Sequence, residues 1–278
     1  MTGEFDATAL VNSFAELAIR AGAVILEVRD AGIDVMSKDD ASPVTEADRR
    51  AEELILAGLE ILCPGIPVVA EEASSAGKCP QIMSDRFILV DPLDGTREFI
   101  AGRPDFTVNI ALIENGVPVA GVVYPPMRKT LYAAAGGRAW KVSIDDDGQQ
   151  SEPVALACRA YQSPPCIVAS KSHLTPETAA FIENFEGATT SSVGSSLKFC
   201  MLAEGQADLY PRYGRTMEWD TAAGDAVLRA AGGATRTLDG TTLVYGKRNQ
   251  ANDTDFANPF FISASSEGVE HLEAANNR

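Results

Sequence analysis

The sequence predicts a protein of mixed α+β and α/β structure built in two lobes. Three observations support this: two amphipathic helical segments open the chain, strand-like segments with hairpin signals follow, and strands and helices then alternate to the end. A polar interruption at residues 145–153, "DDDGQQSEP", separates the strand-like segments from the part in which strands and helices alternate. It is the candidate boundary between an N-terminal lobe over residues 1–150 and a C-terminal lobe over residues 151–278.

Two helices are expected at the start of the chain. Residues from about 8 to 29 repeat apolar side chains at helical spacing, which predicts one buried stripe. A second amphipathic helix follows a polar loop; Thr45 or a neighbour caps its start, and Pro64-Gly65 ends it. The apolar stripe of the first helix consists of Leu10, Phe14, Leu17, Ala21, Val24, Ile25 and Val28.

Strands are expected in the rest of the N-terminal lobe. The runs "IPVVAEE" and "RFILVD" are short, apolar and end in acidic residues. Asn115-Gly116 joins two further apolar runs, and this dipeptide is a strong hairpin signal. Gly136-Gly137 marks the tip of a second hairpin.

In the C-terminal lobe, the sequence pattern predicts the order strand, helix, helix, strand, helix, and then a last strand and helix. Thr175 caps the first of these helices, with Pro176 in its first turn. The paired glycines at 232 and 233 end the third helix. The predicted segments are 166–170, 175–185, 195–207, 208–213, 219–233 and 258–275.

The composition argues against several classes of function. The net charge of -16 argues against a nucleic-acid partner, because phosphate contacts need clustered Lys and Arg. The five cysteines are odd in number and lack a CxxC pair, which predicts a reducing compartment rather than disulfides or a zinc site. We expect no segment long and apolar enough to span a bilayer and no targeting segment, and hence a cytoplasmic protein.

Acidic residues follow the ends of several expected elements. Carboxylates just past strand ends lie where an α/β scaffold exposes polar groups to a crevice. Asp91 and Asp94 are so close in sequence that their charges would repel, and carboxylate and carbonyl oxygens are the ligands that Mg²⁺ prefers. The two aspartates are therefore expected to share metal ions. The whole group is Glu71, Glu72, Asp91, Asp94 and Asp220.

Each acidic position also has a purely structural explanation. Asp94-Gly95 alone is most often a turn. Glu71 and Glu72 alone are usually a solvated strand end, and Asp220 alone a helix N-cap or first-turn acid. Their combination in this order favours the metal interpretation.

The motifs "AEE", "DPLDGT" and "WDTAAGDAVLRAAGG" resemble those of the metal-dependent, lithium-sensitive phosphatases of the inositol monophosphatase superfamily. This resemblance covers most of the chain. "DGTREFI", "SKSH", "VGSSLKFCMLAEGQADLYPRYG" and "YGK" followed by "NPFF" are most similar to its bisphosphate nucleotidases. The resemblance implies a layered αβαβα sandwich, with most metal ligands in the N-terminal lobe and Asp220 in the C-terminal lobe.

The resemblance also implies the role of each site residue. Two or three Mg²⁺ ions would activate the water that attacks the phosphorus. Asp48 and Thr96, together with Glu71, would orient and deprotonate that water. The implied metal ligands are Glu71, Asp91, the Leu93 carbonyl, Asp94 and Asp220.

Substrate contacts are implied in the same way. Arg212 and Arg215, just before the last motif, are further candidate phosphate partners, because cations beside metal ligands are informative in so acidic a chain. The implied substrate-binding residues are Glu71, Leu93, Asp94, Gly95, Thr96, Ser170, His173, Ser195, Lys198 and Asp220.

Without the resemblance, four of these residues have ordinary explanations. Asp48 would be an exposed acid early in the second helix, and Thr96 a turn residue. His173 would be a surface residue at a helix entry, and Lys198 a solvent-facing helix cation.

The implied activity is hydrolysis of the 3'-phosphate of 3'-phosphoadenosine 5'-phosphate (PAP) to AMP, extending to 3'-phosphoadenylyl sulfate (PAPS), in sulfate assimilation. The alternatives are an inositol monophosphatase or sugar phosphatase, against which "DGTREFI" and "SSLKF" argue, and a non-catalytic sensor, against which the complete ligand set argues. We expect a small nucleotide substrate, a monomer or homodimer, and no integral membrane association; the family also implies peripheral association with the inner membrane.

Overall fold

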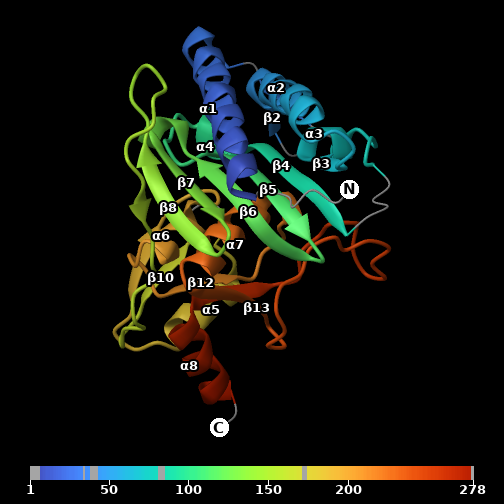
Figure 1. The fold of residues 1–278 in the computed structure, drawn as a ribbon. Coiled ribbons are helices and arrows are strands. Elements are labelled where there is room, and N and C mark those ends of the chain that lie inside the picture. Colours follow the sequence, from blue (N-terminus) through green and yellow to red (C-terminus); the bar gives the residue numbers. More distant parts are fainter. Residues whose placement is uncertain (1–6, 34, 38–42, 81–84, 171–173, 277–278) are drawn as a thin grey trace.

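The computed structural model describes residues 7–33, 35–37, 43–80, 85–170 and 174–276. Its elements stack in five layers in the order helices, sheet, helices, sheet, helices (Figure 1). Three clusters of buried apolar side chains fill the four spaces between these layers, because the second cluster extends from the larger sheet past the central helices to the smaller sheet. The predicted αβαβα sandwich is therefore confirmed.

The outer helical layer consists of α1 and α2, which pack together on one face of the larger sheet. Val11, Phe14 and Ile25 of α1 are fully buried there. The Thr45 side chain accepts a hydrogen bond from the Ala47 N–H at 3.2 Å, which confirms the predicted cap. The bounds are α1 Ala7–Ala31 and α2 Glu46–Leu62.

The expectation about membrane-spanning segments needs correction. The segment Thr8–Ala31 of α1 is long and apolar enough, by length and composition, to cross a membrane. In the structure its predicted apolar stripe, apart from the half-buried Val24, belongs to the first core cluster. Packing of this layer therefore accounts for the apolar character of α1.

The larger sheet has seven strands in the order β3-β4-β5-β6-β7-β8-β9. Only the β3–β4 pair is parallel, and both predicted hairpins are present. Asn115 and Gly116 have φ of 50° and 76°, the left-handed values that a tight two-residue turn requires. The bounds are β3 Val68–Ala70, β4 Arg86–Asp94, β5 Thr107–Glu114, β6 Val117–Tyr124, β7 Thr130–Ala135, β8 Arg138–Ser143 and β9 Val154–Ala155.

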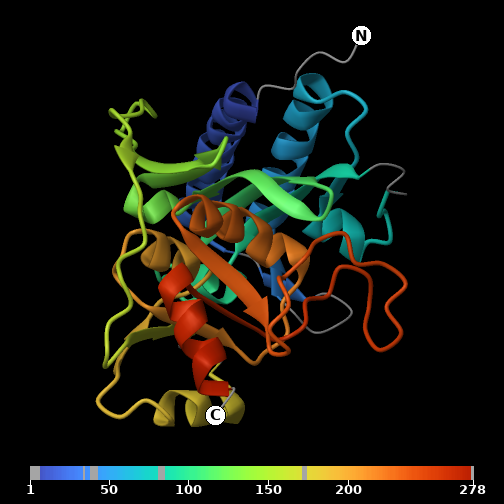
Figure 2. The same ribbon diagram turned by 60° about the horizontal axis from the view of Figure 1, so that its bottom comes forward.

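The central helices α6 and α7 lie between the two sheets (Figure 2). Small residues allow close approach on both sides of α7. A Cβ at Gly224 of α7 would lie 2.6 Å from the Phe199 ring, and a Cβ at Gly121 of β6 would lie 3.0 Å from the Ala223 Cα. The middle of α7 is thus held tightly between α6 and the larger sheet. The bounds are α6 Leu197–Ala203 and α7 Glu218–Ala230.

The smaller sheet has five strands in the order β11-β10-β12-β14-β13, with α5 and α8 on its outer face. The sequence did not predict β11 and β13, because both are edge strands rich in threonine, serine or charge. The bounds are β10 Cys166–Ala169, α5 Pro176–Glu183, β11 Thr189–Ser192, β12 Leu209–Arg212, β13 Gly233–Thr237, β14 Phe261–Ser265 and α8 Ser266–Asn276.

Short elements complete the chain between the predicted ones. β9 still pairs with the larger sheet, beyond residue 150, and the division into lobes at that residue stays a prediction. The short elements are β1 Val35–Ser37, β2 Pro43–Thr45, α3 Glu71–Ser75, α4 Thr96–Ile100 and the 3₁₀ helix η1 Pro126–Arg128.

Candidate active site

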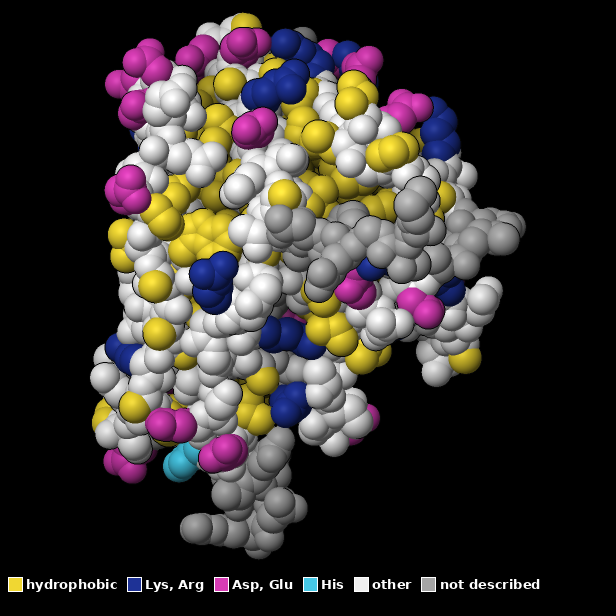
Figure 3. Space-filling model, in the orientation of Figure 1, with side chains coloured by type: hydrophobic (Ala, Val, Ile, Leu, Met, Phe, Trp, Pro, Cys, Tyr) yellow, Lys and Arg dark blue, Asp and Glu magenta, His cyan; other side chains and the backbone are white. Residues whose placement is uncertain are grey.

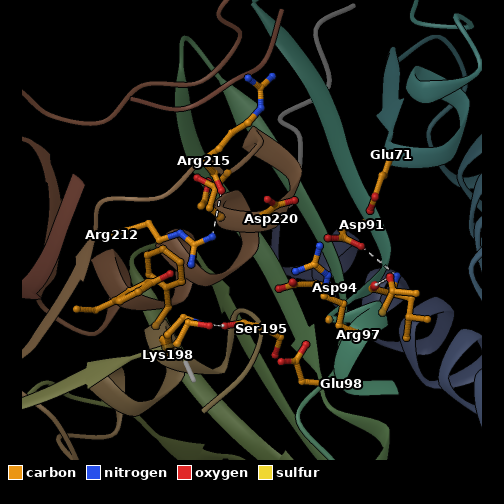
Figure 4. Close-up of a pocket in the computed structure, with 18 of the residues that line it drawn as sticks. Glu71, Asp91, Asp94, Arg97, Glu98, Ser195, Lys198, Arg212, Arg215 and Asp220 are labelled. Carbon is orange, nitrogen blue, oxygen red and sulfur yellow. Dashed lines mark hydrogen bonds between the residues drawn. The ribbon is translucent and has the colours of Figure 1, made fainter. Parts of the chain in front are cut away.

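One pocket collects almost all of the predicted site residues (Figure 4). Its walls come from the ends of β3 and β4, the turn before α6, the end of β12 and the start of α7. His173 lies outside the described residues. The predicted residues that line this pocket are Glu71, Asp91, Leu93, Asp94, Gly95, Thr96, Ser170, Ser195, Lys198, Arg212, Arg215 and Asp220.

The turn that ends β4 is shaped by its own residues. The backbone N–H of Leu93 donates to Asp91 Oδ1 at 3.0 Å, and the pairing of β4 with β5 shifts register between Asp91 and Asp94. Gly95 has a φ of 95°, and a Cβ there would lie 3.0 Å from the Asp105 backbone oxygen. The motif therefore turns the two aspartates into the pocket rather than extending the strand.

Asp48 lies beneath this turn and is only 1% exposed, so the explanation of Asp48 as an exposed acid is wrong. One carboxylate oxygen accepts the Thr45 N–H and hydroxyl, each at 2.7 Å. The other oxygen accepts the Thr96 hydroxyl at 3.1 Å. Burial raises the pKa of Asp48 to about 6, against the lowering effect of the hydrogen bonds from Thr45. Helix α2 thereby holds a proton acceptor next to Thr96.

Glu71 begins α3, and a second acid of α2 holds that short helix. Glu52 is 6% exposed, and its two carboxylate oxygens accept the backbone N–H groups of Glu72 and Ala73, each at 2.8 Å. The sequence reasoning missed Glu52. Its spacing of four residues from Asp48 in one helix was the available signal, since such residues share a face.

Asp220 lies in the first turn of α7. Its Oδ2 accepts the backbone N–H of Met217 at 2.8 Å, so the capping role and the role in the pocket coincide. In Figure 4 its carboxylate faces the same space as Asp91 and Asp94. A residue at the start of α7 thus joins the acids at the ends of β3 and β4.

The buried carboxylates raise one another's pKa. Burial is the main cause at Asp91, Asp94 and Asp220, and repulsion from neighbouring carboxylates adds to it at Asp91 and Asp220. At Asp94 the positive charge of Lys198 acts in the opposite direction. A cation among these groups would relieve the repulsion.

The donor set fits Mg²⁺ better than a softer metal, because it consists of carboxylate and carbonyl oxygens. Among the described residues, no three His, Cys, Asp or Glu side chains stand close enough to enclose an ion by themselves. Mg²⁺ usually takes one or two carboxylates and completes its shell with waters and substrate phosphate oxygens, so it does not require a complete cage of protein ligands. Glu71, Asp91, Asp94, Asp220 and the Leu93 carbonyl would hold it.

Cations line the opposite wall of the pocket. Lys198 is only 4% exposed, so the explanation of Lys198 as a solvent-facing cation is wrong. Its ammonium donates to the Ser195 carbonyl at 2.6 Å and lies 5.3 Å from the Tyr210 ring centroid. Burial lowers the pKa of Lys198 to about 8, while the charge of Asp94 acts to raise it. This wall carries the cations, although the acid Glu98 also lines the pocket and its charge acts to raise the pKa of Lys198.

Two arginines extend the cationic wall toward solvent. Arg212 donates to the backbone carbonyls of Gly214 at 3.2 Å and Arg215 at 3.0 Å, which orients its guanidinium over the pocket (Figure 4). Arg215 pairs with Asp253 at 2.7 Å. On the face of the molecule seen in Figure 3, by contrast, Lys and Arg side chains stand apart from one another and are interspersed with acidic ones. The sequence reasoning missed Arg97, which also lines the pocket.

Comparison with known proteins shows which family this chain is similar to. The family model described as the inositol monophosphatase family matches residues 6–270. The 3'(2'),5'-bisphosphate nucleotidase CysQ of Salmonella typhimurium (strain LT2) is 45% identical over 254 residues, which cover 91% of this chain and 98% of that protein.

Solved structures agree with this placement. The crystal structure of CysQ from Bacteroides thetaiotaomicron is 39% identical, with a TM-score of 0.72 over 91% of this chain and 97% of that chain. The inositol monophosphatase of Thermotoga maritima is 24% identical, with a TM-score of 0.75 over 96% of each chain, and shows the fold alone.

Proposed function

The chain belongs to the inositol monophosphatase family, and we propose that it is a Mg²⁺-dependent, lithium-sensitive 3'(2'),5'-bisphosphate nucleotidase that hydrolyses PAP to AMP and phosphate. The observation that carries the proposal is the division of one pocket into an acidic wall and a cationic wall. A substrate with two phosphate groups uses both walls, whereas inositol 1-phosphate has a single phosphate for the acidic wall. The name of the relatives at 44–45% identity also supports this substrate.

The acidic wall is the proposed site of the reaction. Bound Mg²⁺ would neutralise the phosphate oxygens and lower the pKa of the attacking water. Thr96 would hold that water through its hydroxyl, with Asp48 and Glu71 as the proton acceptors. The water oxygen bonds to phosphorus, the P–O3' bond breaks, and the 3' oxygen leaves and is protonated.

The cationic wall is the proposed site of the second phosphate. Lys198 is buried beside the Ser195 carbonyl, and Arg212 is held by two backbone carbonyls. Preorganised cations of this kind bind phosphate more strongly than mobile surface residues, because less side-chain freedom is lost on binding. Ser170 also lines this pocket, and His173 stays a predicted substrate contact.

The wider role follows from the same substrate. We extend the proposal to PAPS, which carries the same 3'-phosphate, and to a cytoplasmic role in sulfate assimilation. The state of assembly, monomer or homodimer, stays a prediction.

Phosphate release by the purified chain tests the proposal. PAP, PAPS, inositol 1-phosphate and fructose 1,6-bisphosphate are compared at equal concentration with Mg²⁺, with EDTA, and with added Li⁺. We expect preference for PAP, loss of turnover in EDTA and inhibition by Li⁺, with Asp220→Asn as the inactive control. Preference for inositol 1-phosphate would instead identify an inositol monophosphatase, and no turnover of any substrate would favour a sensor.

A further inference from the structure

Ser196 lies just before α6 and is 2% exposed. Its backbone N–H donates to Asp94 Oδ2 at 2.6 Å. Its hydroxyl oxygen lies 2.6 Å from the Asp220 carbonyl oxygen and 3.0 Å from Asp94 Oδ2. One residue therefore connects two acids of the pocket that stand on different elements, Asp94 at the end of β4 and Asp220 in the first turn of α7, and far apart in the sequence.

Asn109 of β5 completes this contact. Its Nδ2 donates to Ser196 Oγ at 3.0 Å and to Asp94 Oδ2 at 3.3 Å. Its Oδ1 is buried without a hydrogen-bond partner in the structure, so the amide gives up an acceptor contact to point its donors at the carboxylate. Oδ2 of Asp94 thus faces several donors, and Oδ1 remains for the pocket.

The turn that carries Ser196 is held by the segment before β5. A Cβ at Gly194 would lie 2.6 Å from the Asp105 backbone oxygen, so only glycine allows this approach. Asp105 in turn pairs with Arg128 at 2.6 Å. Ser195 has a φ of 50°, an unfavourable value for a serine that the surrounding contacts must impose. This turn is therefore built to place the residue that follows it.

We propose that Ser196 and Asn109 are positioning residues that hold Asp94 so that it presents Oδ1 alone to the divalent cation, and that Ser196 also fixes Asp220 relative to Asp94. The inference rests on the proposed function for the presence of the cation. Ligating carboxylates that are themselves hydrogen-bonded bind metal more tightly, and loss of such a partner typically lowers metal affinity about 10–100-fold. The proposal therefore concerns affinity for the metal rather than recognition of the nucleotide.

Isothermal titration calorimetry tests this positioning role: the metal-free full-length chain is titrated with Mg²⁺ in the absence of substrate. Ser196→Ala removes the hydroxyl but keeps the backbone N–H. We therefore expect Mg²⁺ affinity to fall about 10-fold, the lower end of the range for loss of such a partner. Asn109→Ala is expected to act similarly. In the double variant, the loss of Mg²⁺ binding free energy should be smaller than the sum of the two single losses, because both residues hold the same carboxylate.

Ser192→Ala is the matched control, because Ser192 is an exposed serine of β11 in the same segment. Thermal unfolding in EDTA measures each variant's stability independently of metal, and Asn109→Ala serves where Ser196→Ala does not fold. Unchanged Mg²⁺ affinity in variants that have lost stability would overturn the proposal and leave a structural role. If the unaltered chain does not bind Mg²⁺, both this proposal and the proposed function are overturned. If Ser196→Ala turns over PAP and binds Mg²⁺ as tightly as the unaltered chain, only the positioning role is overturned.

Discussion

The Thr96 hydroxyl lies 3.1 Å from Asp48 Oδ1 and joins helix α2 to the turn that ends β4. The same hydroxyl lies 3.3 Å from the Leu93 carbonyl oxygen. A threonine in this position can relay a proton between a water in the pocket and the buried carboxylate. This contact ties the first helical layer directly to the proposed chemistry.

Removal of the Thr96 hydroxyl should reduce turnover without unfolding the chain. Thr96→Val keeps the shape of the side chain but loses the contact with Asp48. Since positioned proton transfer contributes typically about 10²–10⁴-fold, we expect kcat for PAP to fall about 100-fold or more. Steady-state kinetics measures this, with the exposed Thr190→Val as the matched control. A kcat within a factor of two of the unaltered chain would exclude the relay.

Loss of the Lys198 charge should separate bisphosphate from monophosphate substrates. Lys198→Met keeps the buried aliphatic length, and a hydrogen bond to a charged group is worth about 1.5–3 kcal/mol. We expect kcat/KM for PAP to fall about 10–100-fold relative to that for 3'-AMP, which lacks the 5'-phosphate. Parallel losses on both substrates would place Lys198 outside the second phosphate site.

Glu52 should support Glu71 through α3. Glu52→Gln leaves only one acceptor oxygen for the two backbone N–H groups, so one buried N–H loses its partner. Such a loss costs about 1–3 kcal/mol, and we expect the free energy of unfolding to fall by that amount in urea titrations. Glu53→Gln is the control, because the Glu53 side chain is 73% exposed. Equal effects of the two substitutions would contradict the special role of Glu52.

Asp208 should stabilise the smaller sheet in a pH-dependent way. Its buried carboxylate accepts hydrogen bonds from Arg159 Nη2 at 2.6 Å and from the Cys166 N–H at 2.7 Å. Burial acts to raise its pKa, but these bonds hold the pKa below its usual value. Because the folded pKa is depressed, this stabilisation is present above the unfolded pKa of about 4 and is lost as the pH falls through the folded pKa.

Asp208→Asn leaves the partly exposed Arg159 facing a neutral group, so at pH 7 we expect a loss of about 1.5–3 kcal/mol in the free energy of unfolding. Urea unfolding from pH 7 to pH 3 measures the difference between this variant and the unaltered chain. The difference should shrink with acid, and a difference independent of pH would show that the charge of Asp208 does not contribute.

Local sequence was sufficient for most of the elements. Thr45 caps α2, Asn115-Gly116 turns a hairpin, and Gly95 bends the chain after β4 because each depends on backbone preferences of a few neighbouring residues. The edge strands β11 and β13 could not be predicted in this way, since their polar residues acquire strand structure only from the neighbours they pair with.

The sequence by itself therefore determined the layered fold, through its pattern of elements and its resemblance, and the acids that line the pocket. Tertiary structure alone decided that Lys198 is buried, that Glu52 holds α3, and that Ser196 joins Asp94 to Asp220. The physical reason is that burial and hydrogen bonding between distant residues depend on how the layers pack. Local preferences specify where a strand or helix ends, but only packing specifies which side chains meet there.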